Sequence, residues 1–218
     1  HGRVYALKAD VASYFHSIDH AAMNALLARR IGCQRTLALC REIIGSSGGS
    51  KGIPIGNLSS QLFAGIYLDA LDRYVKHDLK LRHYIRYQDD FLILGPDNRE
   101  LHQVREHIEL WLHENLQLTL NSKTAVFPAG ITRGRGIDFV GYRIWATHRK
   151  LRRSSIRRIS RTMRRLQKKY AEGKCTLERI RAHLQSWHAH ASYADTFGLR
   201  RWISRRWVFS QRADSADS

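Results

Sequence analysis

The segment HYIRYQDDFLILG, residues 83–95, places two adjacent carboxylates between two runs of strand-forming residues. β-Branched and aromatic residues flank a polar tip, a pattern that predicts a β-hairpin with Gln88, Asp89 and Asp90 at its turn. Paired negative charge in such an apolar setting is costly. We therefore expect a compensating positive charge beside the two carboxylates.

A third carboxylate, Asp10, ends an apolar strand that the sequence predicts over residues 3–11. If this strand lies beside the hairpin, Asp10 meets Asp89 and Asp90. Three carboxylates so close repel one another unless a hard cation lies between them, and Mg²⁺ prefers oxygen ligands of this kind together with substrate phosphates. The alternative is that Asp89 and Asp90 form only a polar turn and that Asp10 is a residue at the approach to a helix.

The rest of the sequence predicts a mixed α and β domain followed by a small basic helical one. In chain order, the predicted elements of the first domain are a helix over 23–31 capped by Ser17 or Asp19, a glycine-rich loop over 45–52, helices over 58–77 and 101–112, and a strand over 137–145 containing Gly141. Residues 149–170 carry eleven basic and no acidic side chains, with apolar residues every three or four positions, which is typical of an amphipathic helix. Helices over 178–187 and 195–208 follow, with Trp187, Trp202 and Trp207 as expected core residues.

Composition limits the classes of function. The 218 residues are 43% hydrophobic, enough for one globular domain or two small ones. The 37 Lys and Arg against 19 Asp and Glu give a net charge of +18, which favours polyanions such as nucleic acid or anionic membrane. No apolar run approaches ~18 residues and no signal peptide opens the chain, so we expect a cytoplasmic protein without a membrane partner. Cys33, Cys40 and Cys175 lack metal-site spacing, so we expect reduced thiols and no zinc site.

Five segments in a fixed order resemble the motifs of reverse transcriptases, over nearly the whole chain. DVASYFHSIDH (10–20) is similar to motif A, GIPIGNLSSQLFAGIYLDALD (52–72) to motif B, YQDD (87–90) to the Y-x-D-D of motif C, LTLNSKT (118–124) to motif D, and IDFVGYRIW (137–145) to the primer-grip strand. The resemblance implies an RNA-directed DNA polymerase that extends a DNA or RNA primer on an RNA template with dNTPs, by two-metal nucleotidyl transfer.

The resemblance also implies the domain organisation and an α+β (mixed α/β) fold. Residues 1–147 would form a polymerase palm, an antiparallel sheet packed on helices, with a remnant of the fingers. Residues 148–212 would form a helical basic thumb, and 213–218 a tail. The sequence opens at His1, already inside a strand-like segment, so we expect an internal piece of a longer protein whose N-terminal fingers are missing.

The same resemblance implies roles for the acidic residues. Asp10 and Asp89 would be the main ligands of two Mg²⁺ ions, for which Mn²⁺ can substitute, with the Val11 carbonyl helping and Asp90 completing the cluster. Lys123 matches the motif D lysine that protonates pyrophosphate. The alternative for Lys123 is a solvated surface lysine.

Two further positions would contact the incoming nucleotide. Phe15 matches the family's steric gate, where a ring abuts the sugar 2′ position, with a core aromatic as the alternative. In the pattern I-G-x-x-x-S-Q, formed by Ile55, Gly56, Ser60 and Gln61, Ile55 stands where most reverse transcriptases carry Gln in Q-G-x-x-x-S-P. Ile55 offers no hydrogen bond, so misincorporation would cost less. The alternative is that Ile55 is a core residue after Pro54.

The I-G-x-x-x-S-Q pattern resembles the polymerases of diversity-generating retroelements. These enzymes copy a template repeat with errors at adenines, work with a small basic accessory protein, and serve bacteria or their phages. The alternatives are a retron, group II intron or antiphage-defence reverse transcriptase, or a non-catalytic nucleic-acid-binding module whose basic helical half binds the polyanion.

The remaining candidates would bind template and primer. Gly141 would let the backbone approach a nucleic-acid strand and Tyr142 would support the primer end, with a strand bulge and simple packing as the alternatives. The polar side of the basic helix would form a thumb surface, and its arginines are Arg157, Arg158, Arg161, Arg164 and Arg165. A charge run is often only a solvated face, but cations without an anion repel one another unless phosphates are near.

Overall fold

The computed structural model describes residues 3–130 and 135–210. The chain forms two compact units, His1–Ala129 and Gly130–Ser218. The sequence predicts a domain boundary at residues 147–148. In the structure the two units divide after Ala129, and Tyr142, which precedes the predicted boundary, packs against the core of the helices that follow. The predicted tail, 213–218, lies outside the described residues.

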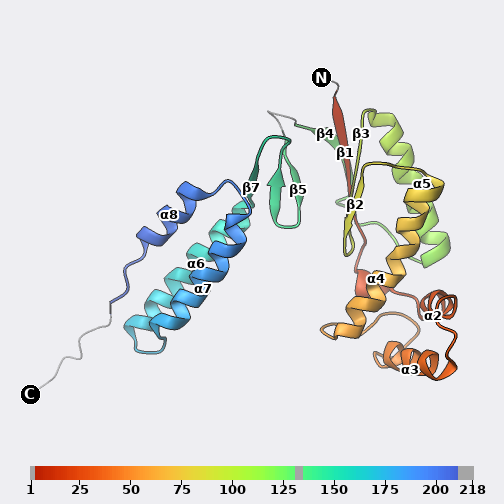
Figure 1. The fold of residues 1–218 in the computed structure, drawn as a ribbon, viewed down its shortest axis with the longest axis horizontal. Helices are drawn as coiled ribbons and strands as arrows, with labels where there is room; N and C mark the ends of the chain where they lie inside the picture. Colours follow the sequence, from red (N-terminus) through yellow and green to blue (C-terminus); the bar gives the residue numbers. More distant parts are fainter. Residues whose placement is uncertain (1–2, 131–134, 211–218) are drawn as a thin grey trace, which may run out of the picture. The chain divides into compact units, whose positions relative to one another are not determined.

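The first unit is built on a four-stranded antiparallel sheet in the order β2-β3-β1-β4 (Figure 1). Its strands are β1 Val4–Asp10, β2 Tyr84–Tyr87, β3 Asp90–Gly95 and β4 Ala125–Ala129. The predicted first strand and the predicted hairpin are therefore confirmed, and they form the centre of the sheet. The edge strand β4 is not predicted by the sequence pattern, since it contains Pro128, a residue that sheets accept at an edge.

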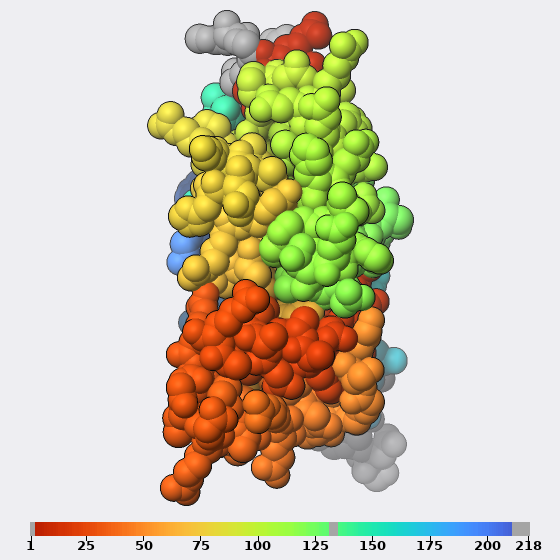
Figure 2. Space-filling view, turned by 90° about the vertical axis from the view of Figure 1, so that its right-hand side faces the viewer, coloured from red at the N-terminus to blue at the C-terminus, as the bar shows by residue number. Residues whose placement is uncertain are grey.

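Helices cover one face of this sheet. Their bounds are α1 Tyr14–Ser17, α2 His20–Ala28, α3 Gln34–Gly45, α4 Leu58–Arg73 with the π-helical turn η1 Tyr74–Asp78, and α5 Asn98–Leu116. Asp19 caps α2 and Asp97 caps α5, each accepting hydrogen bonds from the first-turn N–H groups. Figure 2 looks onto this helical face, where α5 (green) lies beside the yellow segment around η1, above the orange α2 and α3.

The core of the first unit lies between the sheet and these helices. Alternate strand residues, Leu7 and Ala9 in β1 and Phe91 and Ile93 in β3, are buried in one cluster with the apolar faces of the helices. The helices α2, α4 and α5 match the predicted periodicity. Helix α3 is not predicted by it, because few of its side chains are buried.

The second unit joins a small sheet to three helices (Figure 1). Its elements are β5 Ile137–Phe139, β6 Tyr142–Ile144, β7 Arg149–Leu151, α6 Arg153–Ala171, α7 Leu177–Ser192 and α8 Phe197–Arg206. The prediction of one strand over 137–145 is wrong: Val140 and Gly141 both have positive φ, 45° and 86°, and reverse the chain into a hairpin. The basic helix begins at Arg153, since residues 149–151 pair with β6.

The second core gathers apolar residues of all three helices, including Met163, Trp187 and Ile203. Trp187 is buried as predicted, and Trp207 packs partly against this core. The prediction for Trp202 is wrong, because the residue is 47% exposed and its ring lies under the Arg206 guanidinium at 4.6 Å. Within the described residues, no helix is both long enough and apolar enough to cross a bilayer.

Candidate active site

Asp10 and Asp90 lie directly opposite each other in the ladder between β1 and β3. The Asp10 C=O accepts a hydrogen bond from the Asn121 N–H at 2.7 Å, on the other side of β1. Asp10 and Asp90 are therefore a non-hydrogen-bonded pair, in which the side chains share a face and the Cα atoms are about 4.5 Å apart. Their neighbours Ala9 and Phe91 are buried toward the helices, so the two carboxylates are on the opposite face.

Asp89 joins this group from the hairpin turn. Tyr87 pairs with Asp90 and leaves Gln88 and Asp89 as a two-residue loop, with a φ of 57° at Gln88 as tight hairpins require. The pKa of Asp10 is raised by its burial, then by the charges of Asp89 and Asp90 and by a hydrogen bond with Asp89. The structure thus brings together the three predicted carboxylates, although Asp90 begins β3 rather than lying in the turn.

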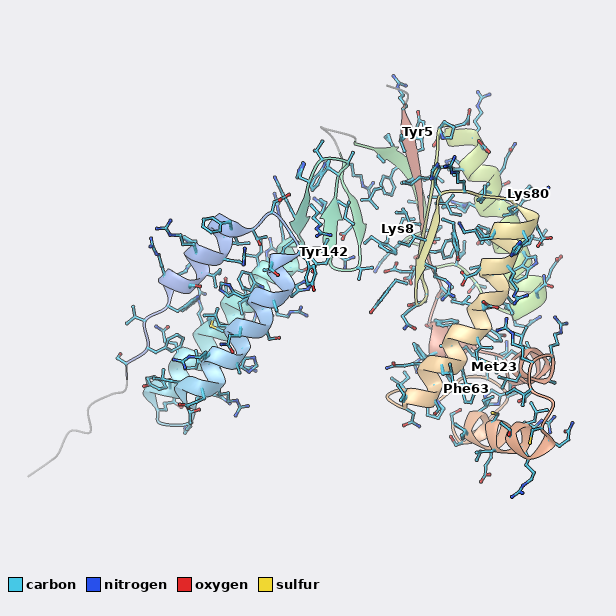
Figure 3. All side chains as sticks on the ribbon, viewed as in Figure 1. Tyr5, Lys8, Met23, Phe63, Lys80 and Tyr142 are labelled. Atoms are coloured by element: carbon cyan, nitrogen blue, oxygen red, sulfur yellow. The ribbon has the colours of Figure 1, made fainter. Side chains whose placement is uncertain are left out.

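Two neighbours of the carboxylates are absent from the predicted set. Lys8 Nζ lies 3.4 Å from Asp90 Oδ1, and Figure 3 shows Lys8 on the side of the sheet away from α4 and α5. Asn121 Nδ2 donates to Asp10 Oδ2 at 3.2 Å, while Asn121 Oδ1 accepts the Lys123 N–H at 3.0 Å. Strand alternation already puts Lys8 on the face of Asp10. The Asn121 contact depends on a long-range pairing that no local pattern indicates.

The donor atoms suit a hard divalent cation. In the part of the chain that the structure describes, no three Asp, Glu, His or Cys side chains are grouped closely enough to enclose a metal by themselves. Mg²⁺ in phosphoryl-transfer sites needs only one or two carboxylates beside waters and substrate phosphates. Burial raises the pKa of Asp10 first and the charges of Asp89 and Asp90 raise it further, and a cation would relieve this repulsion. The residues present therefore fit such an ion.

Val11, whose C=O is expected to help as a ligand, lies directly after β1. Val11 is buried and forms an isolated antiparallel β-bridge with Leu120. On either side of this bridge, the Asp10 C=O accepts a hydrogen bond from the Asn121 N–H and the Ala12 N–H donates one to the Thr119 C=O. Because successive residues of a strand point their polar groups to opposite sides, the Val11 C=O is directed away from Leu120, toward the side of β3.

The residues predicted to contact the nucleotide differ in how far they are buried. Phe15 is half-buried beside Tyr14, with ring centroids 5.6 Å apart. Ile55 is 66% exposed, so the alternative that it is a core residue is wrong. Gly56 follows it with a φ of 102°, a conformation that favours glycine.

The other two residues of the same motif lie in α4. Gln61 is exposed, whereas Ser60 is fully buried, with its hydroxyl unpartnered among the described residues. Burial argues against direct contact between Ser60 and a nucleotide. The Lys123 side chain is exposed, whereas its backbone N–H donates a hydrogen bond to Asn121 Oδ1.

In the second unit, Gly141 lies in the β5–β6 turn and Tyr142 begins β6. The Tyr142 hydroxyl donates to the His190 C=O at 2.8 Å and lies 3.0 Å from His190 Nδ1, so its ring is fixed against α7. The five predicted arginines are all exposed along α6, and within the described residues none of the five forms an ion pair. These residues are Arg157, Arg158, Arg161, Arg164 and Arg165.

The profile of the family described as reverse transcriptase (RNA-dependent DNA polymerase) matches residues 1–144, about two thirds of the chain. The chain belongs to the reverse transcriptase family. The matched region contains the whole acidic cluster and the β5–β6 hairpin.

Solved telomerase structures share the fold of this chain. Apo telomerase from Candida tropicalis, truncated from its C-terminal domain, has a TM-score of 0.55 at 15% identity over 70% of this chain and 36% of the telomerase chain. The telomerase of the same organism in complex with a TWJ fragment of telomeric RNA has a TM-score of 0.54 at 12% identity, over 96% and 41%. The Candida albicans telomerase with a TWJ fragment has a TM-score of 0.52 at 15% identity, over 92% and 43%.

These similarities support the predicted α+β fold, and the chain spans less than half the length of each telomerase chain. No curated protein matches the sequence.

A second charged cluster lies on the helical face of the same sheet. Asp72 of α4 accepts hydrogen bonds from Arg86 Nε at 2.7 Å and Tyr84 Oη at 2.6 Å, and a further one from Arg86 Nη2. Burial alone would lower the pKa of Arg86, but hydrogen bonds and the charge of Asp72 raise it. Burial, and then Asp72, raise the pKa of Tyr84. Arg86 Nη1 also donates to the Gln88 C=O at 2.9 Å.

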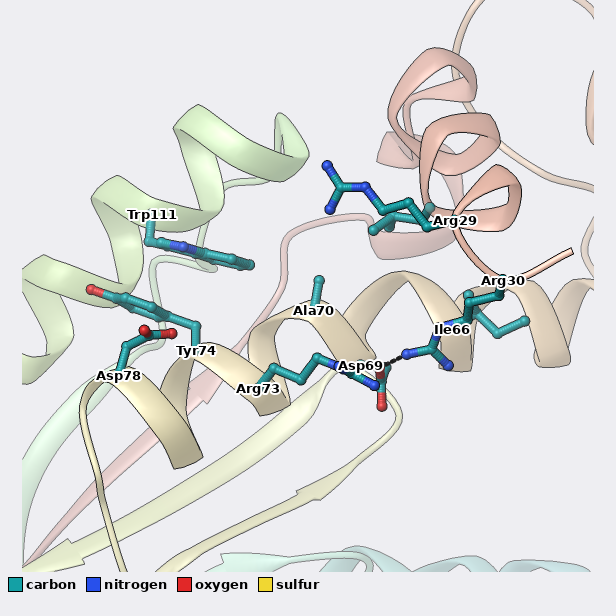
Figure 4. Close-up of a pocket in the computed structure, with 10 residues that line it drawn as sticks. Arg29, Arg30, Ile66, Asp69, Ala70, Arg73, Tyr74, Asp78 and Trp111 are labelled. Atoms are coloured by element: carbon teal, nitrogen blue, oxygen red, sulfur yellow. Dashed lines mark hydrogen bonds and ion pairs between the residues drawn. The ribbon is translucent and has the colours of Figure 1, made fainter.

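A cavity of about 470 Å³ also opens on the helical face, between α2, α4 and α5 (Figure 4). Tyr74 and Trp111 stack along one wall with ring centroids 4.8 Å apart. Asp69 on another wall is paired with both Arg30 and Arg73. The acidic cluster of Asp10 is on the opposite face of the sheet, so this cavity is a separate feature.

Proposed function

We propose that this chain carries the polymerase centre of an RNA-directed DNA polymerase, which extends a DNA or RNA primer on an RNA template with dNTPs. The observation that carries the proposal is the cross-strand pair of Asp10 and Asp90 with Asp89 at the adjoining turn. Family membership supports the reaction type, and the net charge of +18 suits a polyanionic template and primer.

The roles of the acidic residues follow from the donor atoms. Asp10 and Asp89, with the Val11 C=O, would hold two divalent ions, Mg²⁺ or Mn²⁺, which stabilise charge on the attacking 3′-hydroxyl and the departing pyrophosphate. Asn121 orients the Asp10 carboxylate through its hydrogen bond to Oδ2. Lys8 offsets part of the negative charge at Asp90.

The substrate-facing roles rest on the motif positions. Phe15 would abut the sugar and exclude ribonucleotides. Lys123 would give a proton to pyrophosphate, since its exposed ammonium is carried by a turn that Asn121 ties to Asp10. The basic face of α6 and the Gly141–Tyr142 turn would bind template and primer.

The test of the polymerase assignment is primer extension on a poly-rA template. Asp89→Ala should abolish synthesis while salt-sensitive RNA binding stays intact, because the carboxylate is needed for chemistry and not for phosphate contacts. Retention of normal extension by Asp89→Ala would refute the assignment. The non-catalytic alternative predicts RNA binding without extension in the unmodified protein as well.

We further propose that the enzyme is the error-prone polymerase of a diversity-generating retroelement, working with a small basic accessory protein in bacteria or their phages. The exposure of Ile55 supports this subtype, because an exposed apolar side chain at a nucleotide contact cannot hold a base pair through a hydrogen bond. Ile55→Gln should lower misincorporation opposite template adenine by about tenfold. Sequencing of the products measures this, and unchanged error rates would remove the argument from Ile55.

A further inference from the structure

Lys8 lies in the inner strand β1, on the face of the sheet that carries the acidic cluster. Its partners in the two neighbouring strands are Leu92 in β3 and Ala125 in β4, and neither side chain carries a charge. The Lys8 side chain is only 28% exposed. A lysine is rarely so enclosed without an anion beside it, so its position in the sheet requires one.

The anion is Asp90, two residues along β3 from Leu92. Diagonal neighbours on one face of an antiparallel pair lie within reach of long side chains, and Lys8 Nζ is 3.4 Å from Asp90 Oδ1. The Asp90 side chain is itself only 30% exposed. Because salt and water screen partly buried pairs less than surface pairs, the ammonium offsets much of the charge of this carboxylate.

Lys8 does not act equally on the three carboxylates. Asp10 accepts a hydrogen bond from Asn121 instead. Burial, and then the charges of Asp89 and Asp90, raise the pKa of Asp10, and the opposing effect of the Lys8 charge is smaller than any of these. Lys8 is therefore fixed to one carboxylate of the cluster and only weakly offsets the charge of Asp10.

We propose that Lys8 is a positioning residue that keeps Asp90 from ligating a divalent ion and thereby sets the affinity of the acidic cluster for such ions. The ammonium holds one oxygen of Asp90, so Asp10 and Asp89 supply the carboxylate ligands. With one carboxylate neutralised, the cluster binds a divalent ion more weakly than three free carboxylates would. The inference rests on the proposed function, because it takes this cluster to be the site of the divalent ions.

Binding of Mn²⁺ to the protein without nucleotide or nucleic acid, measured by electron paramagnetic resonance of the free ion, tests this role. Lys8→Met removes the ammonium at nearly constant size and should tighten Mn²⁺ binding about tenfold. Lys8→Arg keeps the charge and should bind Mn²⁺ within about twofold of the unmodified protein. Unchanged or weaker binding by Lys8→Met would overturn the proposal.

Lys80→Met is the matched control. Lys80 is exposed, and Figure 3 shows it on the helical side of the sheet, away from Lys8. Lys80→Met changes the net charge of the chain as much as Lys8→Met does, and it should leave Mn²⁺ binding unchanged. Equal tightening by the two variants would mean a general effect of net charge and would count against a role of Lys8 in the cluster.

A double-mutant cycle tests whether Lys8 acts through Asp90. In the Asp90→Asn background, Lys8→Met should change the Mn²⁺ affinity by no more than about twofold, because the carboxylate that the ammonium holds is gone. A full shift in this background would show that Lys8 acts on the cluster without Asp90, and the positioning role would be wrong. A lysine that only stabilised the fold would change the melting temperature and leave these affinities as they are.

Asp10→Asn separates this inference from the proposed function. It should abolish the tight Mn²⁺ binding of the unmodified protein, because the amide is a poor ligand for a hard cation. If Asp10→Asn binds Mn²⁺ as the unmodified protein does, the cluster is not the ion site, and the proposed metal centre fails together with the role of Lys8. If Asp10→Asn loses the ion while Lys8→Met changes nothing, the metal centre stands and only the role of Lys8 fails.

Discussion

The two faces of the first sheet carry carboxylates in contrasting settings. On the helical face, Asp72 receives three hydrogen bonds, two from Arg86 and one from Tyr84. On the other face, Asp10 meets Asp89 and Asp90, and Lys8 is paired with Asp90 at 3.4 Å.

The contrast separates a carboxylate that stabilises the fold from carboxylates that strain it. Removing either partner of a buried carboxylate–guanidinium pair lowers the stability of the fold. Clustered carboxylates raise one another's pKa and remain costly until a cation binds. The face whose negative charge is only partly offset is therefore the one where a function must explain the charge.

The largest expected difference between the two faces is in catalysis. Asp10→Asn should reduce primer extension by about 10³-fold or more, since an amide cannot replace the carboxylate as a ligand of a divalent ion. Asp72→Asn, the matched change on the helical face, should reduce it by no more than about tenfold. Single-turnover extension rates measured below the melting temperature of both variants check this. Equal losses would break the distinction between the faces.

The second difference is in stability, where the larger loss is expected on the helical face. Asp72→Ala should lower the free energy of unfolding by about 2 kcal/mol, because Arg86, whose side chain is only 14% exposed, is left without its anion. Asp10→Ala should cause no comparable loss, since it removes repulsion. Urea unfolding followed by circular dichroism measures both. A larger loss for Asp10→Ala would contradict the assignment of strain to the acidic face.

The smallest effect is a dependence of stability on pH. The folded-state pKa of Asp10 lies above its ordinary value of 3.8, so the folded state binds this proton more tightly than the unfolded state. Without divalent ions, stability should therefore fall as pH rises from the ordinary value through the raised one. Asp10→Asn should flatten this part of the profile.

Mg²⁺ at neutral pH should raise the melting temperature of the unmodified protein and leave that of Asp10→Asn nearly unchanged, as thermal melts would show.

The sequence predicts the acidic centre because its signals are local. Strand alternation fixes the face of Asp10, and the polar tip of YQDD fixes the turn that carries Asp89. The order of the motifs then places them in one fold. What local signals cannot supply is the pairing of distant residues, and so the hydrogen bond of Asn121 to Asp10 and the edge strand β4 emerge only from the structure.

The second unit shows where periodicity fails. Strands of three residues are too short to produce a clear alternation, so the pattern over 137–145 indicates one strand instead of a hairpin. A run of arginines predicts a charged helix, but it does not distinguish Arg158, which lines a cavity between α6 and α7, from Arg157, which does not. Burial of Trp202 could not be judged from its type alone, because Trp often packs with one face open to solvent.

Arg86 has a consequence for how this protein can change over generations. Its guanidinium donates hydrogen bonds both to Asp72 and to the Gln88 C=O. One side chain thus connects a helix residue to the turn that carries Asp89. Replacement of Asp72 or Arg86 singly should be tolerated poorly, whereas a compensated double replacement should be tolerated better than the two separate costs suggest. Positions 72 and 86 should therefore drift together across lineages, linked by epistasis rather than by proximity in the chain.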